Sequence, residues 1–122
     1  MSKALKVTFL VHAFVALGFG VPLLLAPGRF LGLFGWEPVD PLMSRLLGSA
    51  LLALAWGSWQ GWRATERAQV NTLLEMEVVF TVLGSAGLLR HLLIAGYPWY
   101  VWMIFVILAA FAVAWVIFLF KK

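Results

Sequence analysis

The final apolar run, from Trp99 to Phe120, constrains this chain more than any other feature of its sequence. It carries no charged or amide side chain, and its one hydroxyl belongs to Tyr100. About 20 apolar residues in a row are enough for a helix to cross the hydrocarbon core of a bilayer. The 122 residues are 64% hydrophobic and 11% charged, whereas soluble domains average about 25% charged. A domain of this size cannot hide so much apolar surface from water, so a soluble enzyme, a nucleic-acid binder and a disordered segment are poor interpretations.

Three further apolar segments precede the final one. The sequence therefore predicts an all-α fold, a four-helix transmembrane bundle that forms one integral membrane domain over residues 1–122. Asp40 and Pro41 indicate a helix start, because aspartate caps free amides and proline is tolerated at the first helical position. Thr72 and Glu75 have the spacing of a capping box. The first segment is longer than the roughly 7–15 residues of a signal-peptide core, so it is expected to be a retained helix. The expected helices cover about residues 5–26, 41–62, 72–95 and 98–120.

Basic residues predict the orientation of these four spans. Six of the nine fall on the side that holds both termini, and Arg29, Arg45 and Arg90 fall on the other side with Glu37 and Asp40. The positive-inside rule then places both termini in the cytoplasm of a multi-pass protein of the cell inner membrane. The six are Lys3, Lys6, Arg63, Arg67, Lys121 and Lys122. Aromatic residues agree as interfacial belts: Trp36, Tyr97, Trp99, Tyr100 and Trp102 outside, and Trp59 and Trp62 inside.

Residues 27–39 form the one connection of any length. They are too apolar for a free loop and too short and glycine-rich to span. We expect a short segment in the outer interface, with its apolar side chains in the membrane and Arg29 and Glu37 facing water. The segment is then a cap over the end of the bundle, and the alternative is a moving lid.

Polar residues inside the spans are the candidate functional residues, because they are costly in lipid. By depth, His12 and Glu77 belong to an inner layer, and Arg45, Arg90 and His91 to an outer one. Glu75 lies at the inner level too, where the capping box explains it. Long basic side chains near helix ends reach the headgroups, so Arg45 and Arg90 are expected to contact lipid phosphate.

Glu77 is the best single candidate, since no capping role explains it. At about 100° per residue, Thr81, Gly84 and His91 follow on its face, which is expected to line the interior of the bundle. A hydrogen bond between His12 and Glu77 would orient the imidazole and share a proton with it. A packed histidine bonded to a carbonyl or to water is at least an equal alternative.

Neither cofactor nor metal is expected from the sequence. His12 and His91 belong to different layers, which disfavours a haem held by both in one chain. There is no cysteine, no metal-ligand spacing and no recognisable catalytic motif.

Small residues predict where helices pack. Ala53, Gly57 and Gly61 form a track with a spacing of four along the second span, and Gly84 adds a small position on the third. Such tracks let helix backbones approach closely in lipid, either within the bundle or with a partner.

Two stretches carry a resemblance to a known group of proteins. LLLAPGRFLGLFG (23–35) and DPLMSRLLGSALLALAWGSW (40–59) resemble the small four-helix bacterial membrane proteins grouped as DoxX-like or of unknown function. The resemblance covers about residues 20–62. It implies a compact four-helix integral membrane protein without an assigned reaction.

The favoured function is that of a small non-enzymatic integral membrane protein, an accessory subunit or scaffold of a membrane complex. Its expected partners are the lipid bilayer and other membrane subunits or a second copy, with no nucleic acid. The alternative is a small transporter or lipophilic-ligand-binding bundle that uses Glu77 and His12. An enzyme acting on lipids is the third possibility, and the sparse acid–base inventory disfavours it.

Overall fold

The computed structural model describes residues 1–36, 39–94, 96 and 98–121. Most of these residues are helical and none of them is in a strand, which confirms the all-α prediction. Expectations that concern Glu37, Ala95, Tyr97 and Lys122 lie outside the described residues. The elements are α1 (Lys3–Leu25), α2 (Pro27–Gly32), α3 (Pro41–Arg63), the 3-10 helix η1 (Arg67–Gln69), α4 (Asn71–Ile94) and α5 (Trp99–Phe120).

The long helices begin and end close to the places that the sequence indicates. Asp40 caps α3 as expected, because its Oδ1 accepts hydrogen bonds from the backbone amides of Leu42 (3.0 Å) and Met43 (3.1 Å). The predicted capping box at Thr72 is wrong, since α4 begins at Asn71 and Thr72 is already inside the helix. A capping box instead joins Glu66 and Gln69 in front of η1.

The segment between α1 and α3 contains a short helix, α2. α1 ends at Leu25, and Pro27 starts α2. The turn after α2 closes with hydrogen bonds from the Gly35 amide to the Gly32 carbonyl (3.1 Å) and from the Trp36 amide to the Leu31 carbonyl (3.0 Å). This is a Schellman pattern, and Gly35 takes the positive φ of 72° that it requires.

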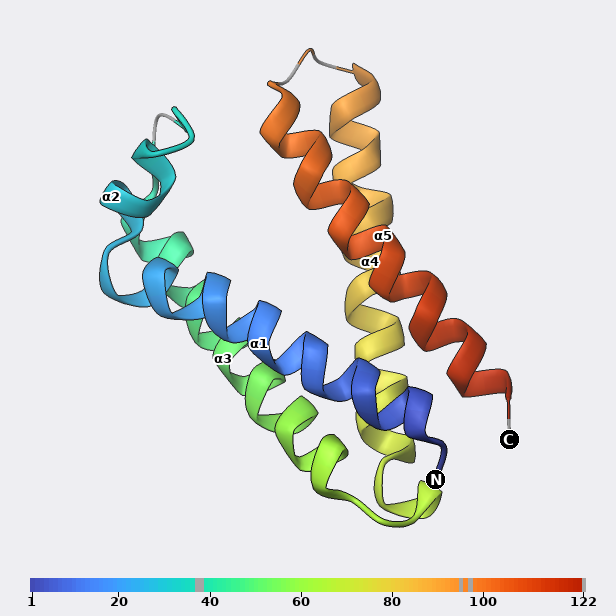
Figure 1. Ribbon diagram of the computed structural model, residues 1–122. Coiled ribbons are helices and arrows are strands. Elements are labelled where there is room, and N and C mark those ends of the chain that lie inside the picture. Colours follow the sequence, from blue (N-terminus) through green and yellow to red (C-terminus); the bar gives the residue numbers. More distant parts are fainter. Residues whose placement is uncertain (37–38, 95, 97, 122) are drawn as a thin grey trace. The chain divides into compact units, whose positions relative to one another are not determined.

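The chain divides after Thr65 into two compact units, residues 1–65 and 66–122. The first consists of α1, α2 and α3, and the second of η1, α4 and α5 (Figure 1). In each unit the two long helices pack against each other as a helical hairpin.

Glycines set the packing of the first hairpin. A Cβ atom at Gly48 of α3 would lie 2.7 Å from the Leu24 backbone nitrogen and 2.9 Å from the Gly20 carbonyl oxygen of α1. A Cβ at Gly61 would lie 2.7 Å from the ring of Phe9, which is fully buried. The two helices are therefore in close contact near both ends of α3.

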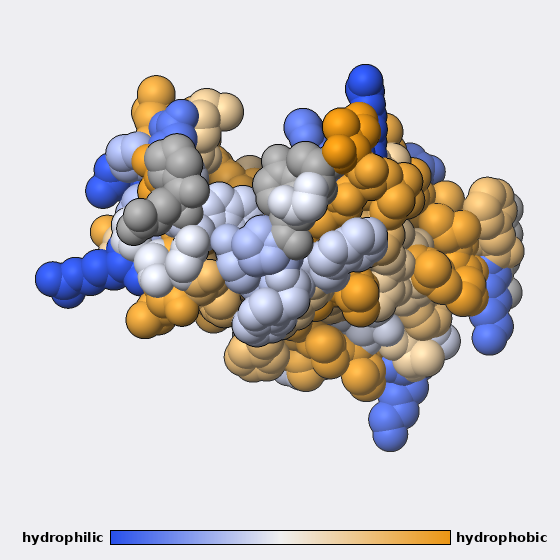
Figure 2. Space-filling view, turned by 90° about the horizontal axis from the view of Figure 1, so that it is seen from above, coloured by the Kyte–Doolittle hydropathy of each residue, from blue (hydrophilic) through white to orange (hydrophobic). Residues whose placement is uncertain are grey.

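Three of the four long helices, α1, α4 and α5, are long and apolar enough to cross a membrane. α3 is also 23 residues long, but its serines, glycines, arginines and Gln60 make it less apolar than the other three. Many large apolar side chains are exposed on all of the long helices, and Figure 2 shows hydrophobic residues over much of one face of the molecule. These features establish a helical protein with three candidate membrane-spanning segments.

Candidate functional site

The clearest polar contact inside the first hairpin joins His12 to Ser58. The His12 Nδ1 and Ser58 Oγ atoms are 2.7 Å apart, and the two residues are only 5% and 0% exposed. Which atom donates depends on the tautomer of the ring. This hydrogen bond ties the middle of α1 to the second half of α3. It accounts for one polar group on each helix that would otherwise have to be satisfied in an apolar environment.

Sequence reasoning missed Ser58. A signal was present, because the small residues Gly48, Ala55 and Ser58 recur with spacings of seven and three, which place them on one face of a helix. All three are buried in the structure, together with Gly61. Of the predicted track, Gly61 is buried, Gly57 is half-buried and Ala53 is exposed. The track and the buried face of α3 thus share only Gly61.

Arg45 is held at the end of α1. Its Nε donates a hydrogen bond to the Leu24 carbonyl oxygen at 3.2 Å, although the side chain is otherwise exposed. The last carbonyls of a helix have no partner within the helix, so they can accept hydrogen bonds from a side chain. A cation near them is also attracted to the negative end of the helix dipole, which stabilises the helix. Arg45 therefore caps α1, and its expected contact with lipid phosphate stays a prediction.

In the second hairpin, Glu77 and Thr81 are buried on one face of α4, with 3% and 0% exposure. The Thr81 hydroxyl donates to the Glu77 carbonyl oxygen at 2.7 Å. Ser85, four residues further on, has a buried hydroxyl oxygen with no hydrogen-bond partner among the described residues. These three residues make a polar ladder along α4, which begins at Glu77.

Trp115 on α5 lies at the level of Glu77. A Cβ atom at Gly84 of α4 would lie 3.7 Å from Leu108 Cδ1 of α5, which fixes the register of the two antiparallel helices. Glu77 and Trp115 are equally far from this contact in sequence, so the common rise of about 1.5 Å per residue brings them to one level. Trp115 is fully buried and stacks on Phe111, with ring centroids 6.3 Å apart.

The later part of the predicted Glu77 face is less buried, since Gly84 is half-buried and His91 is exposed. Arg90, beside His91 near the end of α4, is exposed as well. His12 belongs to the first hairpin and Glu77 to the second, so the hydrogen bond between them stays a prediction.

Arg67 is the second polar residue whose contacts the sequence did not reveal. Its guanidinium donates to the carbonyl oxygens of Phe118 (2.7 Å), Leu119 (3.3 Å) and Lys121 (2.9 Å), while its Nε donates to Asn71 Oδ1 (3.0 Å). The planar guanidinium suits several acceptors at once. Arg67 therefore caps the end of α5 and connects it to the start of α4.

Within the described part of the chain, no group of three or more histidine, aspartate or glutamate side chains could hold a metal ion. Comparisons of the chain with family models, with curated proteins and with solved structures find no match. The resemblance to DoxX-like proteins accordingly stays a prediction.

Proposed function

We propose that the chain is a four-span protein of the cell inner membrane with both termini in the cytoplasm. α3 is less apolar than the other long helices, but its packing on α1 supports its crossing as well. α1 and α3 are joined by the Gly20–Gly48 contact near one end, by His12–Ser58, and by Phe9–Gly61 near the other end. If α1 crosses the bilayer, a helix paired with it over this length crosses too.

Single-cysteine variants test this topology, because the chain has no native cysteine. Ser2→Cys and Glu66→Cys are expected to react with a membrane-impermeant maleimide only when the cytoplasmic face is open. Gly32→Cys and Gly96→Cys are expected to react from the outside of intact cells. Labelling of position 32 from the cytoplasmic face alone would contradict the topology.

We further propose that it serves as a non-enzymatic accessory subunit or scaffold, whose partners are lipids and other helices. One observation carries this proposal: several of the polar side chains with assigned contacts join one helix to another. His12 and Ser58 join α1 to α3, Arg45 caps α1, and Arg67 caps α5. The long helices still expose large apolar side chains, which suits contact with lipid and with other membrane helices.

Purification in a mild detergent or in nanodiscs, followed by mass measurement, tests the subunit role. The expected particle contains either several copies or a second protein in fixed stoichiometry. Ala53→Leu, at an exposed small position of α3, should reduce that particle to the single chain. Val106→Leu, at an exposed position of α5, is the matched control. A wild-type particle that is strictly monomeric would contradict the proposal.

A second candidate is a small transporter or ligand-binding bundle that uses Glu77 and His12. The burial of Glu77 to 3% exposure favours it, because a carboxylate inside a membrane-spanning helix is costly and usually functional. Glu77→Gln keeps the shape of the side chain and removes its charge. In vesicles loaded with a pH-sensitive dye, a proton flux should lose its pH dependence in this variant, with Glu75→Gln as the exposed control. An unchanged flux in Glu77→Gln would remove Glu77 from the mechanism.

A further inference from the structure

Three basic residues gather at one end of the first hairpin. The Phe9–Gly61 contact fixes the register of α1 and α3 at this end. Lys6 lies one turn before Phe9, and Arg63 lies two residues after Gly61, so antiparallel packing brings Lys6 and Arg63 to about the same level. Lys3 lies about one turn further out. We call these three residues, Lys3, Lys6 and Arg63, the basic end.

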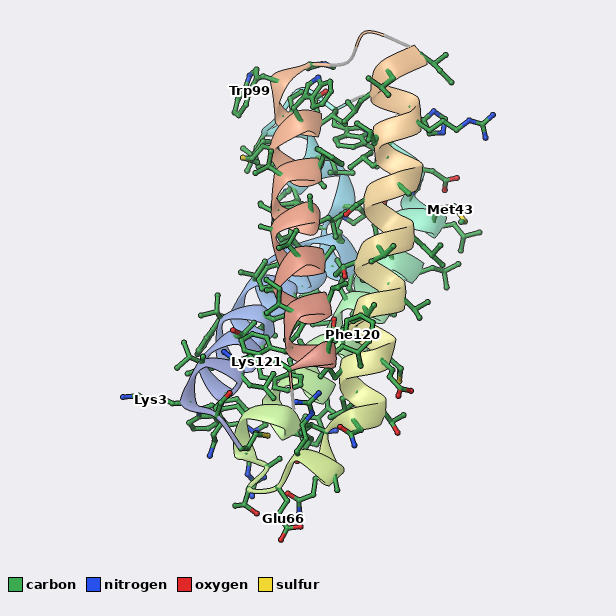
Figure 3. All side chains as sticks on the ribbon, turned by 90° about the vertical axis from the view of Figure 1, so that its right-hand side faces the viewer. Lys3, Met43, Glu66, Trp99, Phe120 and Lys121 are labelled. Atoms are coloured by element: carbon green, nitrogen blue, oxygen red, sulfur yellow. The ribbon has the colours of Figure 1, made fainter. Side chains whose placement is uncertain are left out.

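The charges of the basic end have no acidic counterpart on the same helices. The acidic residues of the first 65 are Glu37 and Asp40, and Asp40 caps the opposite end of α3. Glu66 follows in the chain, and its carboxylate accepts a backbone hydrogen bond in the capping box of η1. Lys3 and Arg63 are exposed and Lys6 is half-buried. Figure 3 shows the Lys3 side chain extending away from α1.

Two tryptophans lie just inside the basic end. Trp59 and Trp62 of α3 have ring centroids 4.8 Å apart, and Trp59 is 37% exposed. Indole rings favour the level at which the hydrocarbon meets the headgroups. Arg63 follows Trp62 directly and lies about one turn beyond Trp59, and the two lysines lie at this level or further out. The guanidinium group and the amines are therefore at the depth of the lipid phosphates.

We propose that the basic end binds the headgroups of anionic phospholipids. Lysine and arginine close to a membrane surface each add about 1 kcal/mol of attraction to anionic lipid, which corresponds to about fivefold in affinity. Zwitterionic lipids carry no net charge and gain little. This lipid selectivity goes beyond the proposed scaffold role, which requires only apolar contacts.

Native mass spectrometry on the full chain in detergent tests the proposal. The probe is an equimolar mixture of phosphatidylglycerol and phosphatidylcholine with identical acyl chains. We expect the wild type to retain phosphatidylglycerol at least tenfold over phosphatidylcholine. The triple variant Lys3→Gln, Lys6→Gln, Arg63→Gln should lose most of this preference. Arg29→Gln, which removes one exposed charge beyond the other end of α1, is the control and should keep the preference.

Further measurements test the proposal even if the triple variant does not fold. In the wild type, 0.5 M salt should weaken the preference severalfold, because exposed charges are screened. Arg63→Gln alone should reduce it about fivefold. Equal retention of both lipids by the wild type would overturn the proposal. Displacement of the lipid by millimolar glycerol phosphate would also overturn it, since the site would then be one for soluble phosphate. A loss in Arg29→Gln equal to that in Arg63→Gln would overturn the assignment to the basic end.

Discussion

Gly48→Ala should push α1 and α3 apart locally and lower the free energy of unfolding, and the size of the effect can be worked out from the structure. The added Cβ atom would lie 2.7 Å from the Leu24 nitrogen and 2.9 Å from the Gly20 carbonyl oxygen, where ordinary contacts begin at 3.4 Å. Both obstacles are backbone atoms, so no side chain can turn aside. The helices have to move apart locally by about 0.7 Å.

A gap of this size removes about a quarter to a half of the dispersion energy of the atom pairs that it opens. Overpacking of a close interface typically costs about 1–3 kcal/mol. Alanine also favours the helix over glycine by up to about 1 kcal/mol, which partly offsets the loss. Gly18→Ala is the matched control, because Gly18 lies on α1 with no atom within 4 Å of its added Cβ. Both variants share the gain in propensity, so their difference isolates the packing cost of about 1–3 kcal/mol.

The free energy of unfolding should be measured for both variants in bicelles, by steric trapping or by denaturant titration followed through tryptophan fluorescence. We expect Gly18→Ala to be at least as stable as the wild type and Gly48→Ala to be the less stable variant. Equal stabilities would refute the close approach of the two backbones at Gly48.

Further predictions concern the polar contacts; those for Ser58 and Arg45 are measured as free energies of unfolding, and that for Arg67 by amide hydrogen exchange. Ser58→Ala removes the hydroxyl bonded to His12 and should cost about 0.6–1.7 kcal/mol, the range for interhelical hydrogen bonds in membranes; no loss would mean that the bond contributes nothing. Arg67→Lys keeps the charge but not the fork of donors. It should speed amide hydrogen exchange in the last turn of α5, and unchanged exchange would contradict the cap. Arg45→Gln should cost about 0.5–1.5 kcal/mol, since it removes the donor to the Leu24 carbonyl, and a stability equal to the wild type would exclude that role.

Local sequence signals predicted most of the helix boundaries. At the start of α3, Asp40 caps the helix and Pro41 occupies the first helical position, as the sequence indicates. At Thr72 the same kind of signal did not mark a helix start. The Glu66–Gln69 capping box belongs to η1, and α4 begins at Asn71, one residue before Thr72.

Contacts that depend on the pairing of distant segments could not be predicted in the same way. Arg67 looked like one of several cytoplasmic charges, because nothing near it in sequence indicates that the end of α5 returns to it. Ser58 lies 46 positions from His12, and only the register of α1 on α3 brings them together. The spacing of Gly48, Ala55 and Ser58 indicates the buried face of α3, but the track of Ala53, Gly57 and Gly61 is an equally regular pattern that shares only Gly61 with that face.

If α3 crosses the membrane beside α1, as we propose, the pairing of the two helices gives a physical reason why the less apolar helix is tolerated there. Alone in lipid, the hydroxyl of Ser58 and the imidazole of His12 would each face hydrocarbon, which is costly for a polar group without a partner. Together they satisfy each other, and the glycines of both helices allow the backbones to come close enough for that bond to form. On the proposed topology, the cost of inserting α3 would therefore be a property of the hairpin and not of α3 by itself. Hydropathy counted helix by helix would then underestimate how readily such a pair enters the bilayer.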